Sequence, residues 1–118
     1  MSYLTKLPSQ WTVTGDSTAN AAVTITKAAQ PNKKHYITAI EAVVSGAAVG
    51  AADVAVELRD GSTVKWKSII GAAAVQGTRV VMAFSHPVEL STNAAANLYA
   101  AAGGTGVIIT LNMAGFTA

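Results

Sequence analysis

The chain has 118 residues, of which 51% are hydrophobic, 12% are charged and none is cysteine, and its formal net charge is +2. The length fits one domain, and the lack of cysteine excludes a disulfide framework or a thiolate metal site. The net charge is too weak for electrostatic capture of nucleic acid. We see neither the long apolar stretch of a membrane span nor a signal-peptide core at the start. We therefore expect no nucleic-acid or membrane partner.

Alanine accounts for 24 of the 118 residues, so much of the apolar content consists of small side chains. Small side chains bury little area each, and burial contributes only about 25 cal/mol per Å². A thin core of this kind often gains stability from contacts between subunits. We therefore expect a homo-oligomer.

Residues 1–20 differ from the rest because they are rich in Ser, Thr, Gly and Asn. We interpret this segment as an N-terminal arm or a loosely paired strand, and residues 21–118 as the β-domain. The candidate partner-binding residues are the large apolar side chains of the arm: Tyr3, Leu4, Leu7 and Trp11. Trp11 either docks on a neighbouring chain or packs within its own.

From residue 21 onward, short runs of alternating apolar and polar residues are separated by Gly, Ala, Asp, Asn or Pro. Such runs predict half-buried β-strands, and they occur at residues 23–26, 34–45, 54–59, 64–67, 79–84, 88–90, 95–102 and 107–114. The alanine-rich run 95–102 could also be helical by propensity, but the turn residues on both sides favour a strand. Pro87 is expected to break the chain between two runs.

Strands at this spacing predict an all-β fold, an antiparallel β-sandwich of about eight strands. We favour a jelly-roll-like arrangement, with an immunoglobulin-like topology as the alternative.

The clearest hairpin lies around Asp60-Gly61. A three-residue loop, residues 60–62, would pair Val56 with Trp66 and Glu57 with Lys65. A two-residue loop would instead turn lysines toward the buried face, because a slip of one residue exchanges the faces of a strand. We therefore predict the three-residue loop, with Trp66 facing the core and Lys65 facing solvent together with Lys67.

Few residues could carry catalysis. His35 and His86 are the only histidines, and neither has a second ligand at metal-binding spacing. Ser85 precedes His86, but adjacent residues on a strand point to opposite faces and cannot share a proton. The glycine cluster at residues 103–106 precedes a strand, whereas a phosphate-binding loop precedes a helix.

The six acidic residues do not indicate a pair for glycoside cleavage. Glu57 has a cross-strand lysine partner, and Asp60 belongs to a turn that favours Asp. We therefore expect a non-enzyme with no catalytic residue, no cofactor and no metal.

Aromatic residues offer one alternative function. Tyr3, Trp11, Tyr36, Trp66 and Tyr99 could stack on sugars if their rings were exposed beside polar groups. A receptor- or carbohydrate-binding module of a phage fibre or tail is thus the alternative to a structural protein. The outward basic residues near the hairpin, Arg59, Lys65 and Lys67, are expected to be a solvated face, with weak affinity for an acidic partner as the alternative.

Four segments, in this order and spacing, resemble motifs of small structural proteins of tailed-phage and prophage virions. An aromatic residue before the first strand, here Trp11, belongs to the same pattern. The segments are His35–Ile40 (HYITAI), Val56–Trp66 (VELRDGSTVKW), Phe84–Val88 (FSHPV) and Asn112–Phe116 (NMAGF). Val88 stands where Leu is usual, and the loop at residues 46–52 is unusually rich in alanine; both departures concern packing.

The resemblance implies a virion protein assembled in the host cytoplasm. Jelly-roll proteins of this size on phage heads typically act as decoration or cement subunits, often as trimers. The resemblance therefore implies a homotrimer bound to the major capsid protein.

Overall fold

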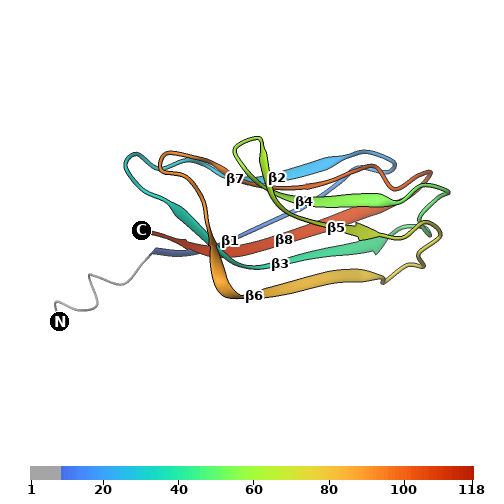
Figure 1. The fold of residues 1–118 in the computed structure, drawn as a ribbon. Helices are drawn as coiled ribbons and strands as arrows, with labels where there is room; N and C mark the ends of the chain where they lie inside the picture. Colours follow the sequence, from blue (N-terminus) through green and yellow to red (C-terminus); the bar gives the residue numbers. More distant parts are fainter. Residues whose placement is uncertain (1–8) are drawn as a thin grey trace.

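The computed structural model describes residues 9–118, and the described residues form eight β-strands and no helix. The strands are β1 (Ser9–Asp16), β2 (Val23–Lys27), β3 (His35–Ser45), β4 (Val54–Asp60), β5 (Thr63–Ile70), β6 (Arg79–Glu89), β7 (Ala96–Ala100) and β8 (Ile108–Thr117). Figure 1 shows them as two layers lying one over the other.

The two layers are four-stranded antiparallel sheets with the orders β1-β8-β3-β6 and β2-β7-β4-β5. Consecutive strands fall in different sheets at most steps, and the first strand pairs with the last. This is the strand order of a jelly roll, which confirms the predicted fold class. The immunoglobulin-like alternative would pair the first and second strands within one sheet.

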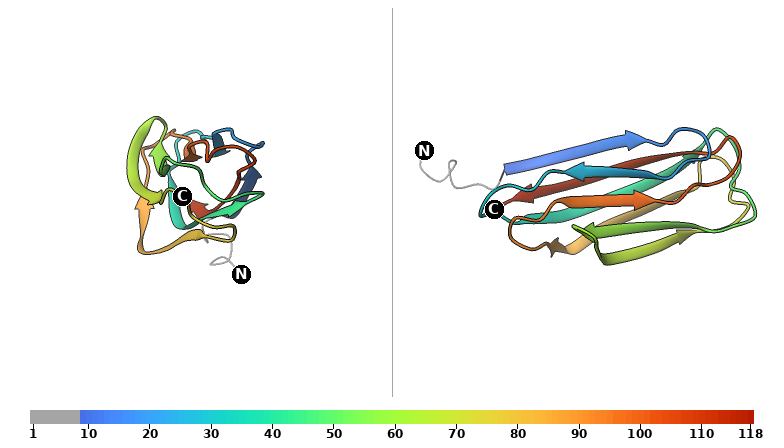
Figure 2. Two further views of the ribbon diagram at one scale, coloured as in Figure 1. Left: turned by 90° about the vertical axis from the view of Figure 1, so that its right-hand side faces the viewer. Right: turned by 90° about the horizontal axis from the view of Figure 1, so that it is seen from above.

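The core lies between the sheets, as the end-on view in Figure 2 shows. The central strands β3, β4, β7 and β8 alternate strictly between buried and half-buried residues, apart from one irregularity in β3 and one at the end of β4. Period-two burial of this kind is what a pleated strand with one inward face requires. The inward residues with no exposed surface include Ile37, Val54, Leu58, Leu98 and Leu111.

Residues 9–16 of the segment expected to be an arm belong to the sandwich. They form β1, which pairs with β8 along its whole length, from Ser9 opposite Thr117 to Asp16 opposite Thr110. Of the two interpretations of this segment, the described part is thus a paired strand, and the strands begin at Ser9 rather than at residue 21. Residues 1–8, with Tyr3, Leu4 and Leu7, lie outside the described residues.

The hairpin between β4 and β5 has a different register from the predicted one. Trp66 lies opposite Leu58 rather than Val56, and Glu57 lies opposite Lys67. The predicted three-residue loop is therefore wrong.

A bulge accounts for the difference. Asp60 pairs with Thr63, so the loop is the two residues between them, with Gly61 at a φ of 61°. The register then shifts between Leu58 and Arg59, and Lys65 is the extra residue. The bulge realigns the faces, so Trp66 still packs against the core and Lys65 is exposed, as predicted.

The predicted break at Pro87 is a bend within one strand. β6 continues through Pro87 to Glu89, but residues 84–87 have no partner on β3, whose register shifts between Ile37 and Ala39. Figure 1 shows β6 turning sharply there. β6 is an edge strand, where proline interrupts no ladder on its free side.

The alanine-rich run near the C-terminus is a strand, as predicted. β7 lies between β2 and β4, and Leu98 faces the core while Tyr99 faces outward. Pairing on both sides outweighs the helix propensity of alanine.

Candidate functional site

His35 lies in a buried hydrogen-bond network. Its side chain is 1% exposed, its Nε2 donates to the carbonyl oxygen of Ala28 at 2.7 Å, and its Nδ1 accepts the hydroxyl proton of Thr117 at 2.7 Å. The carbonyl can only accept, which fixes the tautomer. The ring is therefore fully engaged and out of reach of a substrate, which is a structural role.

Trp11 completes this network from the edge strand. Its Nε1 donates to the Thr117 hydroxyl oxygen at 3.0 Å, and its ring meets the His35 ring edge-on at 5.6 Å between centroids. A Cβ on Gly115 would lie 2.9 Å from the Trp11 ring, so only glycine leaves room for it. Of the two alternatives for Trp11, the structure shows packing within its own chain.

Several of the charged side chains pair with each other near the surface. Lys34 meets Glu89 at 3.5 Å, Arg79 meets Glu41 at 3.4 Å, and Arg59 pairs with Glu57. Within residues 9–118, no three His, Cys, Asp or Glu side chains gather as a metal site would require. In the same residues no helix is long and apolar enough to cross a membrane.

One surface contact, between Tyr36 and Glu89, has a measurable effect on the pKa of Tyr36. Its hydroxyl donates to a Glu89 carboxylate oxygen at 3.1 Å, and this bond raises the pKa of Tyr36 above its ordinary value. A raised folded-state pKa means that the contact stabilises the fold below the unfolded-state pKa and is lost as pH rises through the folded-state pKa. The E89Q variant should therefore form the Tyr36 phenolate at lower pH than the unchanged protein.

An ultraviolet titration of phenolate absorbance measures this shift. The same Glu89 substitution in a Y36F background serves as the control, because it isolates the signal of Tyr36 from those of Tyr3 and Tyr99. Equal titration midpoints with and without Glu89 would show that the hydrogen bond is absent in solution.

The described aromatic rings are half-buried, and each contacts a neighbouring side chain. Tyr36 stacks on Phe116 at 4.8 Å, Trp66 packs edge-on against Phe84 at 6.0 Å, and the Arg59 guanidinium lies 4.1 Å from the centre of the Tyr99 ring. A sugar-binding platform needs exposed faces beside polar groups. The geometry of residues 9–118 therefore gives no support to the carbohydrate-binding alternative.

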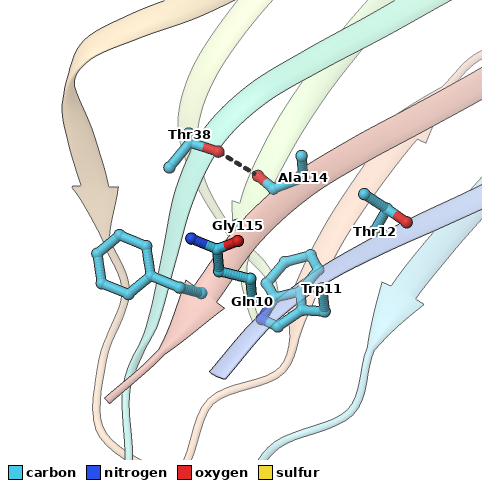
Figure 3. Close-up of a pocket in the computed structure, with 7 residues that line it drawn as sticks. Gln10, Trp11, Thr12, Thr38, Ala114 and Gly115 are labelled. Carbon is cyan, nitrogen blue, oxygen red and sulfur yellow. Dashed lines mark hydrogen bonds between the residues drawn. The ribbon is translucent and has the colours of Figure 1, made fainter. Parts of the chain in front are cut away.

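A shallow groove crosses the outer face of the sheet that contains β1, β8 and β3. Two adjoining hollows form it, and both are lined by Thr12 of β1 and Ala114 of β8. Figure 3 shows one end, with Gln10, Trp11 and Gly115 on one side and Thr38, which donates to the Ala114 carbonyl oxygen at 3.2 Å, on the other.

The groove is hollow because small residues meet in register on neighbouring strands. Ala39 of β3 lies opposite both Ala114 of β8 and Ala83 of β6. Larger side chains lie on both sides of this row along the strands: the stacked Tyr36 and Phe116 on one side, and Val81 on the other. A row of Cβ atoms between larger neighbours leaves a concave apolar floor.

The exposed large apolar side chains belong to one edge of the sandwich. Within the described residues they are 37–68% exposed, and all belong to β5, β6 or the loop between them: Val64, Ile69, Val75, Val81 and Met82. Val64 and Ile69 lie on the outer face of one sheet, and Val81 lies on the outer face of the other. The opposite edge strands, β1 and β2, expose threonines instead. The apolar side chains therefore surround the β5–β6 edge, and grouped exposed apolar residues indicate an interaction surface.

Neither surface was among the sequence-based candidates. The alanine row joins three strands that are far apart in the chain, so its signal appears only once the β3 register is known. The exposed valines Val64 and Val81 have the residue type of core positions, but the register places both on outer sheet faces.

No protein-family model matches this sequence, and neither does any curated protein. Among solved structures, the chain is similar to the PRD1 vertex protein P5, with a TM-score of 0.51, 10% identity and coverage of 93% of this chain and 98% of that one. It also aligns with the structure of tomato aspermy virus at a TM-score of 0.42 and 8% identity, over 92% of this chain and 77% of that one. A carbohydrate-binding module, CBM36 in complex with calcium and xylotriose, aligns at 0.38 and 17% identity, over 87% and 76%. The similarity to the vertex protein supports the fold alone. The two alignments with TM-scores below 0.5 are too weak to support an inference.

Proposed function

We propose that this chain is a structural protein of a tailed-bacteriophage virion, of the head decoration type. In this proposal it forms a homotrimer, binds the assembled shell of the major capsid protein and stabilises it. The observation that carries the proposal is the grouping of exposed apolar side chains around the β5–β6 edge. A subunit that attaches to a surface needs an apolar contact region, while the rest of its surface stays solvated.

The rest of the described chain is consistent with adhesion rather than turnover. Every buried side-chain nitrogen or oxygen atom of residues 9–118 has a hydrogen-bond partner, so the buried polar groups serve the fold. The resemblance of four segments to tailed-phage virion proteins supports the same function. The similarity in fold to a vertex protein over nearly the whole of both chains agrees with it.

The proposed mechanism is linkage between binding and assembly. A protein that binds the closed shell but not its free subunits stabilises the shell by mass action. Apolar contacts at the core of each interface supply the affinity, and repeated copies joined as oligomers add avidity. No covalent step is involved.

Binding to heads tests this proposal. Heads are produced from the phage or prophage that encodes the chain, with the chain omitted, and the purified protein is added before sedimentation. We expect the unchanged protein to sediment with heads, and the variant carrying I69D and V75D to lose on the order of tenfold or more in affinity, because each buried charge costs more than about 1 kcal/mol. The control is T24D, an exposed position on β2 at the other side.

Two outcomes would contradict the proposal. Equal sedimentation of the unchanged protein and the double variant would exclude the β5–β6 side as the contact. Failure to bind heads, combined with binding to tails or to a specific sugar on a glycan array, would favour the fibre or tail module instead.

A further inference from the structure

We propose that residues 1–8 of one copy bind in the outer-face groove of a neighbouring copy. The groove is the hollow above Ala39 and Ala114, flanked by Thr12 and Val81. This inference rests on one part of the proposed function, namely that the chain forms a homo-oligomer. It names the contact that would hold the copies together.

The dimensions of the segment and the groove agree. Eight extended residues span at most about 26–29 Å. The groove runs from the row of Gln10 and Phe116 to the row of Thr14 and Asn112, which is four residues along β8 or about 14 Å. The segment is therefore long enough to fill the groove, and the remaining length can span the distance from its own copy to the neighbouring one.

The chemistry of the two partners is complementary. Residues 1–8 (MSYLTKLP) carry Tyr3, Leu4 and Leu7 as apolar side chains, with Lys6 and the N-terminal amine as positive charges and no acid. The groove has an apolar floor, and Glu41 in its wall already pairs with Arg79, so the complementarity is that of apolar side chains. A large side chain over a floor of alanine Cβ atoms fills space that a β-sheet face otherwise leaves to water.

The direction of β1 favours a neighbour over the same copy. Ser9 lies opposite Thr117 and Asp16 opposite Thr110, so β1 begins beside the Gln10 end of the groove and runs along it. To enter the groove of its own copy, the segment before Ser9 would have to reverse the direction of β1.

Disulfide trapping tests the proposal, since the chain contains no cysteine. A variant with L4C, and separately one with T5C, is mixed with a variant carrying A39C and oxidised. Adjacent residues of an extended segment point to opposite faces, so one of the two arm positions must face the floor. We expect one of the mixtures to form the disulfide-linked heterodimer with on the order of tenfold higher yield than the control, because a bound segment is held at high effective concentration.

The control mixture pairs each arm variant with A55C, a half-buried alanine on the outer face of β4 in the other sheet. Thermal unfolding of each single variant verifies that it folds. Equal yields for the Ala39 and Ala55 mixtures would overturn the proposal. So would a disulfide that forms only within one chain, in a double variant carrying A39C with either arm cysteine, because it would place the segment in its own groove.

This experiment uses purified protein without heads. It can therefore succeed when head binding fails, which would leave an arm-exchanged oligomer of another function. It can also fail when head binding succeeds, which would leave a decoration protein whose copies are joined differently.

Discussion

Replacing Thr117 with valine is expected to lower the free energy of unfolding by about 3 kcal/mol. The hydroxyl of Thr117 accepts from Trp11 and donates to His35 inside the sandwich, so the change removes two hydrogen bonds at once. Each buried polar group left without a partner costs about 1–3 kcal/mol. A domain of this size has about 5–15 kcal/mol in total, so the loss is large.

Urea unfolding followed by tryptophan fluorescence measures this change. The matched control is T110V on the same strand, where the hydroxyl donates to Asp16 at 2.7 Å in an exposed position. We expect the control to lose less than about 1 kcal/mol. Equal losses at the two positions would show that the network of Trp11, His35 and Thr117 does not stabilise the fold.

Replacing Leu98 with alanine should have a similar effect for a different reason. Leu98 is fully buried at the centre of its sheet, opposite Ile25 on one side and Leu58 on the other. Removing its side-chain carbons leaves a cavity, and such changes cost about 2–5 kcal/mol. The inward neighbours of Leu98 on β7 are Ala96 and Ala100, so few neighbouring carbon atoms can move in to fill the space.

The comparison for Leu98 is V64A, because Val64 is 45% exposed. We expect this variant to unfold within about 1 kcal/mol of the unchanged protein. If the Leu98 variant were no less stable than the Val64 variant, the inward direction assigned to β7 would be wrong.

The strands could be predicted from sequence because period-two alternation reports directly which face of a strand is buried. The alternation at residues 34–45 and 107–114 predicted the bounds of β3 and β8 to within a few residues. β1 was harder to identify, because its outward residues are polar and its inward residues are Trp11, Val13 and Gly15, of which the last has no side chain. The glycine interrupts the pattern, although the backbone pairs without a break.

The hairpin register escaped prediction for a related reason. A bulge adds one residue to one strand, and alternation alone cannot distinguish a bulge from a longer loop when both place Trp66 inward. The choice depends on local backbone geometry at Gly61, whose φ of 61° suits the tight turn. The three-residue loop satisfied the burial argument but not the observed pairing.

The surfaces were the least predictable part. Val81 is exposed because it lies on the outer face of its sheet, and its residue type alone does not specify that face. The groove depends on Ala39 and Ala114, which only the pairing of β3 with β8 brings together. The resemblance to phage virion proteins suggested adhesion, but only the assembled sandwich shows which apolar side chains are exposed.

Electron cryomicroscopy of heads made with and without this chain tests the central claim most directly. The account predicts additional density on the outer surface of the head, at the contacts between capsomers. The density should have the size of a small oligomeric β-sandwich and should meet the shell through the β5–β6 side. Identical head surfaces in the two preparations, or the additional density on the tail or fibres alone, would contradict it.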